Sequence, residues 1–218
     1  MLLIPEIRLR SLTAAFVQFI RDDYNDAVDK TTTLMYDWFN GIRDGKLDYY
    51  VEAKKIFLTD DSESRHIVVR SMFDADRMGP PTIHIVLSNE QKGSLDGIAV
   101  DRAENNGAVT FSRSFDTTYS IVFTSDNPVE VYIMYNAIRA MYIMLMSSVE
   151  LAGFRNFKLG GRDVMPNEDI VPVNMLMRSM TATFTYQNSV GLAKQFTQEE
   201  ISRIIFIAND SGEEVISE

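Results

Sequence analysis

The chain has 218 residues, of which 45% are hydrophobic, and a formal net charge of −10, a composition typical of a single globular domain. It contains no cysteine, which excludes disulfides, thiolate nucleophiles and zinc–thiolate centres. The acidic balance, without a run of basic residues, also argues against a protein that reads DNA sequence, because phosphate neutralisation requires clustered Lys and Arg.

The N-terminal part is predicted to begin with two helices. No secretory signal is expected, because the short apolar start is followed quickly by charges. After Pro5, apolar residues recur at three- and four-residue spacings, which predicts an amphipathic helix. A short aromatic helix around Trp38 follows and ends near Gly41 or Gly45. The predicted buried stripe of the first helix is Leu9, Leu12, Phe16, Phe19, Ile20 and Tyr24.

Short β-branched segments then predict strands. They begin at Lys54 (KKIFLT), at Arg65 (RHIVVR) and at Thr82 (TIHIVLS), and acidic or Gly-Pro turns separate them. Residues 88–107 contain three glycines and little pattern, which favours a long loop that is functional or mobile. The segment from Ala108 to Ser125 is typical of one long strand or of a bent hairpin.

A helix that is apolar on almost every side is predicted from Asn127 onward. Asn127 is expected to accept a hydrogen bond from the backbone of Glu130, Pro128 suits the first helical position, and Glu130 can reach back as in a capping box. Arg139 interrupts the apolar run, which is too short for a membrane span. Gly153 is predicted to end the helix in a left-handed cap.

Two strands are predicted after this helix, and together the elements define the fold class. FRNFKLGG, from Phe154, is expected to be a strand that ends in a glycine turn, and the clear alternation from Asn174 to Gln187 is typical of another strand. Thr197 and Glu200 form a second capping-box pattern before an acidic tail at 208–218. The order predicts one α+β domain over 1–218, with a mixed, mainly antiparallel sheet and helices packed on one face.

No catalytic motif is present in the sequence, and we predict no cofactor, metal site or catalytic residue. His66 and His84 lie in strand-like segments without a carboxylate at ligand spacing. Acidic pairs such as Asp74 with Asp76 and Asp96 with Asp101 are more typical of solvated loops than of cation sites. A small metal-dependent enzyme that uses these loops and a cytoplasmic module that binds through 88–107 remain alternatives.

The methionines suggest a contact surface on the apolar helix. Several of the twelve methionines cluster on this helix and on the last predicted strand, where Met suits either core packing or adaptable contacts between subunits. Two arginines within strand alternation could pair inward or cross an interface. The candidate subunit interface is therefore Met134, Met141, Tyr142, Met144, Arg113 and Arg178.

The succession from Ser120 to Gln187 resembles the tail-terminator and tail-completion proteins of tailed bacteriophages. The similar pieces are the capped helix start at Thr124 to Glu130, the helix stop at Gly153, the strand Phe157 to Gly160, and the alternating strand Arg178 to Tyr186. Together they cover about a third of the chain. The resemblance is one of element order and texture.

This resemblance implies a structural virion protein without enzymatic activity, assembled in the host cytoplasm. Such a subunit would form a ring of six or twelve copies at the head-to-tail junction, against portal or other neck proteins and the tail tube protein. No membrane is involved, and DNA would pass through a central channel whose acidic wall repels phosphates. The chain exceeds a minimal terminator in its 88–107 loop, its Trp38 segment and its acidic tail, so a neighbouring neck ring is equally compatible.

Overall fold

A computed structural model describes residues 4–59, 65–71, 81–93, 102–105, 108–163 and 175–192. The helices are α1 (Pro5–Asp26), a 3₁₀ turn (Lys30–Thr32), α2 (Leu34–Phe39), α3 (Tyr49–Phe57), α4 (Pro128–Met144) and α5 (Met146–Leu151). The strands are β1 (Arg43–Asp44), β2 (Leu47–Asp48), β3 (Val68–Ser71), β4 (Thr82–Lys92), β5 (Arg102–Asn105), β6 (Ala108–Ser125), β7 (Arg155–Asp163) and β8 (Leu176–Leu192).

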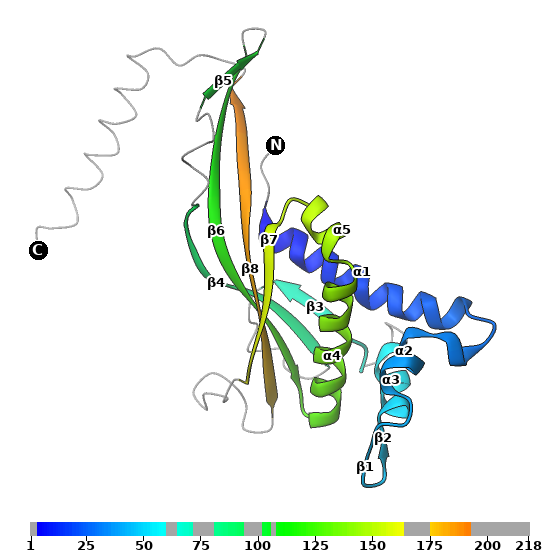
Figure 1. Cartoon of the computed structure of the whole chain (residues 1–218). Coiled ribbons are helices and arrows are strands. Elements are labelled where there is room, and N and C mark those ends of the chain that lie inside the picture. Colours follow the sequence, from blue (N-terminus) through cyan, green and yellow to red (C-terminus); the bar gives the residue numbers. More distant parts are fainter. Residues whose placement is uncertain are drawn as a thin grey trace, which may run out of the picture.

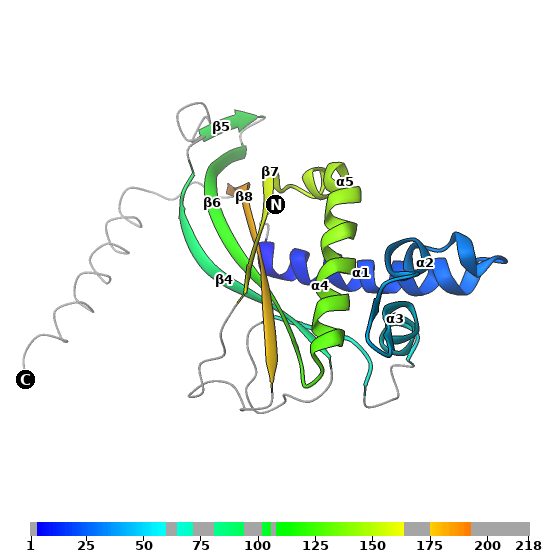
Figure 2. The same ribbon diagram turned by 60° about the horizontal axis from the view of Figure 1, so that its bottom comes forward.

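The described strands form a small hairpin, β1–β2, and one large sheet in the order β3-β4-β6-β8-β7, with β5 added on β6. Strand β3 runs parallel to β4, and the other pairs are antiparallel. The helices lie on one side of the sheet, and β6 and β8 continue past them as a long pair toward β5 (Figures 1 and 2). The predicted α+β class, with a mixed, mainly antiparallel sheet and helices on one face, is confirmed.

Helix α4 lies at the centre of the core. Asn127 caps it as predicted, although its side chain accepts from the backbone of Val129 at 3.0 Å rather than from Glu130. Phe123 of β6 packs edge-on against Tyr135 on one side of α4. Helix α1 crosses another side, where Phe16 packs edge-on against Tyr142 at 4.9 Å between ring centroids. The sheet and α1 thus bury different faces of α4 within the same chain.

Two predicted segments have a different structure. The KKIFLT segment from Lys54 is not a strand, because Asp48 accepts from the backbone of Tyr50 and Val51 and so starts α3 across the first part of the segment. The loop expected at 88–107 begins inside β4, which continues to Lys92 because β6 offers it backbone partners. Residues 102–105 form β5 on the same strand, and residues 94–101 lie outside the described ranges.

Other predictions can be checked locally. Residues 108–125 form one strand, not a bent hairpin. In the buried stripe of α1, Val17 takes the place predicted for Phe19, which is 51% exposed. The spacing alone does not show which of these two residues is buried, because that depends on how α1 packs against the rest of the protein. The apolar helix breaks at Leu145 into α4 and α5, and Gly153 then has the predicted left-handed φ of 100°. Residues 193–218, with the second capping box and the tail, lie outside the described part.

The glycine pair expected to form a turn lies inside β7 instead. A Cβ on Gly161 would stand 2.3 Å from the hydroxyl of Tyr135, whereas a Cβ on Gly160 would meet its nearest atom at 3.8 Å. Tyr135 is only 3% exposed and stacks against Arg178, whose guanidinium lies 4.3 Å from the ring centroid. Gly161 therefore lets β7 approach α4 closely.

Gly161→Ala is expected to destabilise the fold by roughly 1–3 kcal/mol, the usual cost of overpacking a core. The matched control is Gly160→Ala, which has room for its methyl group and is expected to be neutral or slightly stabilising in the strand. Urea denaturation of both variants measures the difference. Equal stability of the two variants would contradict the close approach of β7 to Tyr135.

Candidate interaction surface

Three residues of the predicted subunit interface belong to the chain's own core. Met134, Met141 and Tyr142 are 0% exposed, so their side chains have no surface to offer a second subunit. The hydroxyl of Tyr142 lies 2.8 Å from that of Thr13 in α1, which gives this buried phenol a partner. Burial raises the pKa of Tyr142 above its usual value. Their assignment to an interface is corrected because all three side chains are buried within this chain, and Tyr142 lies against Phe16 and Thr13 of α1.

The other three predicted interface residues are wholly or partly accessible. Met144, in the last turn of α4, is 55% exposed, and Arg113 on β6 is exposed. Arg178 on β8 is half-buried, and its guanidinium lies over the rings of Tyr135 and Tyr132 of α4 at 4.3 and 5.6 Å. Arg178 thus joins β8 to α4, while an interface role for Met144 and Arg113 remains a prediction.

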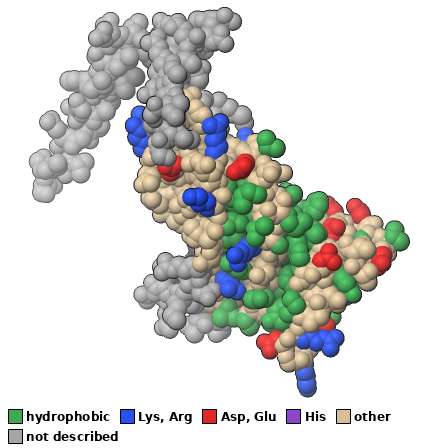
Figure 3. Space-filling view, in the orientation of Figure 1, with side chains coloured by type: hydrophobic (Ala, Val, Ile, Leu, Met, Phe, Trp, Pro, Cys, Tyr) green, Lys and Arg blue, Asp and Glu red, His purple; other side chains and the backbone are tan. Residues whose placement is uncertain are grey.

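Exposed aliphatic side chains gather where the start of α1, the end of α4 and α5 meet. The start of α1 is tied to the end of α5 by Arg8, whose Nη1 donates to the carbonyl of Ala152 at 2.7 Å. Hydrophobic side chains form a broad area over this side of the molecule (Figure 3). We call the exposed hydrophobic residues at the start of α1, at the end of α4 and on α5 the apolar surface: Ile4 (48%), Ile7 (47%), Ile143 (56%), Met144 (55%) and Leu151 (89%).

Of this surface, only Met144 was among the predicted interface residues. Ile143 and Leu151 belong to the same apolar run, but the stripe pattern does not show which flank α1 leaves uncovered. The sequence pattern does not indicate that the start of α1 belongs to this surface, because the contact of Arg8 with Ala152 joins residues 144 positions apart. A signal was nevertheless present, since an apolar run wider than one helical stripe has more than one face to cover.

A cluster of charged groups fixes the beginning of α4. Arg65 donates to Asp126 at 2.7 Å and to Glu130 at 2.9 and 3.0 Å, and Ser125 donates to Glu130 at 2.5 Å. Glu130 is 6% exposed, so its carboxylate depends on these partners. Hydrogen bonding to Arg65 lowers the pKa of Asp126, and the same contacts raise the pKa of Arg65. The cluster joins the approach to β3 with the β6–α4 junction.

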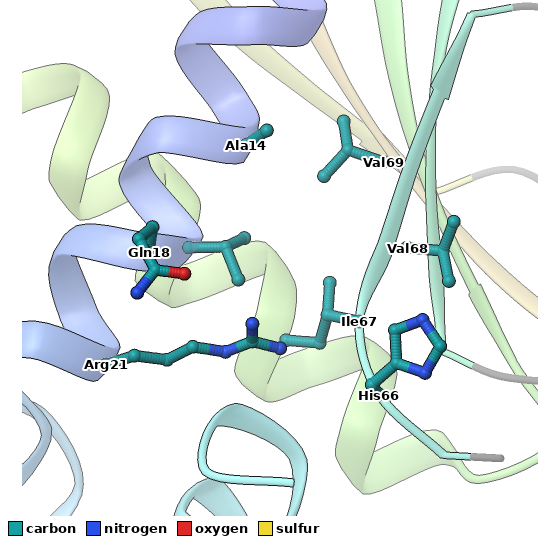
Figure 4. Close-up of a pocket in the computed structure, with 8 residues that line it drawn as sticks. Ala14, Gln18, Arg21, His66, Ile67, Val68 and Val69 are labelled. Atoms are coloured by element: carbon teal, nitrogen blue, oxygen red, sulfur yellow. The ribbon is translucent and has the colours of Figure 1, made fainter. Parts of the chain in front are cut away.

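A pocket of about 300 Å³ lies between α1 and the approach to β3 (Figure 4). Arg21 of α1 and His66 before β3 stand on opposite sides of it, and Ile67 and Val69 supply apolar wall. The Nε of Arg21 donates to the carbonyl of Phe57 at 2.7 Å, so this arginine helps to hold α3 against α1. The pocket walls contain no nucleophile with an adjacent base among the described residues.

A second pocket, of about 450 Å³, lies on the sheet face opposite the helices. Asp116 accepts from the hydroxyl of Thr185 at 2.5 Å, and Thr118 and Thr183 lie in hydrogen-bond contact beside them. Ser88 and Ser120 make the same kind of contact further along. We call this hydroxyl-rich area the polar face. In the described part of the chain, no three His, Cys, Asp or Glu residues are arranged to hold a metal ion.

The acidic residues weighed as cation ligands, Asp74, Asp76, Asp96 and Asp101, lie outside the described ranges. His84 is buried in β4 with its Nε2 3.3 Å from the hydroxyl of Thr124, and His66 is only half-buried. None of the described helices is long and apolar enough to span a membrane.

No protein-family model matches this chain, and no curated protein matches its sequence. Among solved structures, the chain is similar to the sheath/tube terminator of PVC, an extracellular contractile injection system, in its extended state. The two are 14% identical, the match covers 77% of this chain and 72% of the other, and the TM-score is 0.37. A likeness at this level establishes neither a shared fold nor a shared function.

Arg65→Met is expected to destabilise the protein by about 1–3 kcal/mol, since it leaves the buried carboxylate of Glu130 without its cation. Adding Glu130→Gln to this variant is expected to restore part of the loss, because no buried charge then remains. The control is Arg43→Met, which removes a largely exposed ion pair with Asp48 and is expected to change stability by under ~1 kcal/mol. Chemical denaturation measures the free energy of unfolding of Arg65→Met, of Arg65→Met with Glu130→Gln, and of Arg43→Met. Equal losses in Arg65→Met and Arg43→Met would refute the role of Arg65 in neutralising the buried Glu130.

The same cluster predicts a pH dependence. Because hydrogen bonding to Arg65 lowers the pKa of Asp126 below 3.8, the unfolded chain binds its proton more tightly than the folded chain. The stabilisation from Asp126 is therefore present above about pH 4 and lost as the pH falls through the lowered folded pKa. Its size is small, under ~1 kcal/mol, because Asp126 is half exposed. Melting curves from pH 2 to 6 should show this contribution in the wild type and not in Arg65→Met.

Proposed function

We propose that this chain is a structural virion protein that assembles as a closed ring of six or twelve copies at the neck or tail end of a tailed phage. It would contact the tail tube on one side and portal or neck proteins on the other, without catalysis or a cofactor. The observation that carries the proposal is the apolar surface, which remains exposed beside the large buried core of the described residues.

The composition of the apolar surface supports assembly. Large aliphatic side chains scattered singly on a protein surface need no explanation, whereas a group of them marks a contact site. Here Leu151 is 89% exposed, and Ile143 and Met144 are each more than half exposed on the adjoining turn. Burial is worth roughly 25 cal/mol per Å² of apolar surface. A neighbouring subunit would supply that burial.

The order of elements also supports the proposal. The resemblance to tail terminators rests on a strand that leads into a capped helix, a glycine stop and two further strands. The structure has these elements in that order: β6, the Asn127 cap, α4 and α5, the left-handed Gly153, β7 and β8. The order alone is compatible with a terminator and with a neighbouring neck ring.

The polar face suits a wall past which DNA moves. Its side chains are hydroxyls and amides together with Asp116 and Lys158, so the described part of this face has little net charge. A duplex binds protein chiefly through clustered Lys and Arg on its phosphates. We infer that this near-neutral face lines the channel, in place of the acidic wall expected from the net charge. One group of acidic side chains lies instead on the side of the molecule where α1 ends and α2 begins (Figure 3).

Replacing Met144 and Leu151 together by Asp tests the role of the apolar surface. The double variant is expected to fold like the wild type, because both side chains already face solvent, and to lose assembly. The matched control is Leu47→Asp, an exposed apolar residue of the β1–β2 hairpin at 42% exposure. The native mass over a concentration series, with negative-stain imaging for closed rings, measures assembly. Circular dichroism reports on folding.

Two outcomes would refute the ring. One is a wild-type protein that remains monomeric at every concentration. The other is a double variant that assembles as well as the Leu47→Asp control, which would show that the ring does not need the apolar surface.

A further inference from the structure

The exposed charges of α1 are separated along its length. Arg10 is exposed near the start of the helix, and Asp22 and Asp26 are exposed near its end, followed by Asp29. At a rise of 1.5 Å per residue, roughly 24 Å separates Arg10 from Asp26. This exceeds the screening length of about 8–10 Å at physiological ionic strength. The two groups of charges therefore do not neutralise each other within one molecule.

The acidic group is also placed unfavourably for the isolated chain. Asp26 is the last residue of α1, where the helix macrodipole disfavours negative charge. Lys30 donates to the carbonyls of Tyr24, Asn25 and Ala27 and so satisfies the end of the helix. No ion pair in the described structure includes Asp22, Asp26 or Asp29. Asp22 accepts a hydrogen bond from Gln18, and Asp29 caps the 3₁₀ turn by accepting from Thr31, so these two carboxylates also serve the fold. None of the side-chain contacts among the described residues involves Asp26, whose carboxylate the fold therefore does not explain.

Each end of α1 combines its charges with exposed apolar side chains. At the acidic end, Phe19 is 51% exposed and Val28 is fully exposed beside the aspartates. At the basic end, Ile4, Ile7 and Leu151 of the apolar surface are exposed. The charged residues of the basic end, on α1, α5 and the start of β7, are Arg8, Arg10 and Arg155 against Glu6 and Glu150.

We propose that the acidic end of one copy binds the basic end of the next copy, and that this head-to-tail contact closes the ring. The inference rests on the ring assembly proposed above and names the two surfaces that meet. Because the surfaces differ, each copy keeps one end free for a further copy, so the contact propagates until it closes. Burial of the apolar residues drives the contact, and the opposite charges set its orientation.

A charge-reversal experiment tests this contact. The first variant carries Arg10→Glu and Arg155→Glu, which makes both ends acidic. The second variant carries Asp22→Lys and Asp26→Lys, which makes both ends basic. Each variant alone is expected to assemble at least tenfold more weakly than the wild type. An equimolar mixture is expected to assemble again, because acidic and basic copies can alternate around a ring with an even number of subunits.

The controls separate this contact from general charge and from folding. Asp44→Lys and Lys46→Glu reverse exposed charges on the β1–β2 hairpin, away from both ends, and are expected to assemble like the wild type. Asp26→Lys places a cation at the end of α1, so the melting temperature of the second variant is expected to be unchanged or higher. Melting temperatures are compared at a concentration where the wild type is also monomeric, because assembly itself stabilises the folded chain. Loss of assembly with an undiminished monomer melting temperature would support the contact, and a lowered monomer melting temperature in both reversal variants would refute it.

Native mass by light scattering distinguishes failure of this inference from failure of the proposed function. If the wild type and both reversal variants form rings, the head-to-tail contact is refuted and the proposed ring is not. The same holds if the wild type forms a ring but the equimolar mixture of variants stays monomeric. A wild-type monomer at every concentration would refute both. A wild-type dimer that does not grow would show reciprocal pairing of the two ends and would refute the propagating contact.

Discussion

The rest of the structure depends on the burial of a helix that has almost no polar face. Helix α4 is apolar on the side facing the sheet and on the side facing α1, and ten of its seventeen residues are buried. Covering one face requires the sheet, and covering the other requires α1 to cross at Tyr142, with Phe16 and Thr13 in contact. The position of α1 in turn helps to fix α3, because Arg21 of α1 donates a hydrogen bond to the carbonyl of Phe57, the last residue of α3. All helices consequently gather on one face of the sheet (Figure 2).

Much of this fold could be predicted where the cause is local. The Asn127 cap, the left-handed Gly153 and the alternation of β8 depend on neighbouring residues, and the structure has all three. The helix at Tyr49–Phe57 was not predicted, because its second half lies in the segment KKIFLT, which is short and has a strand-like pattern. The residue that caps the helix, Asp48, lies before that segment. The role of Gly161 was equally hidden, because Tyr135 approaches it from a different element.

The contact surface was the hardest part to predict, since exposure is a property of the assembled chain. An apolar pattern shows that a helix has two faces to bury, but not whether the second partner is another helix or another molecule. Here the second partner of Met141 and Tyr142 is the chain's own core, and Met144, only two residues beyond Tyr142, is exposed. The break in the helix at Leu145 marks this change. Of the interface residues predicted on α4, Met134, Met141 and Tyr142 therefore belong to the core, and only Met144 lies on the surface.

The positions of the charged side chains show which of them stabilise the fold and which do not. Glu130 is buried, yet Arg65 and Ser125 satisfy it, so its charge helps to fix the start of α4. Asp26 lies at the opposite extreme: it is exposed at a helix end whose dipole it opposes, and no ion pair among the described residues includes it. Natural proteins retain such locally unfavourable residues where a function requires them. Contact with another copy, as proposed above, is a function that both the exposed aliphatic side chains and the separated charges would serve.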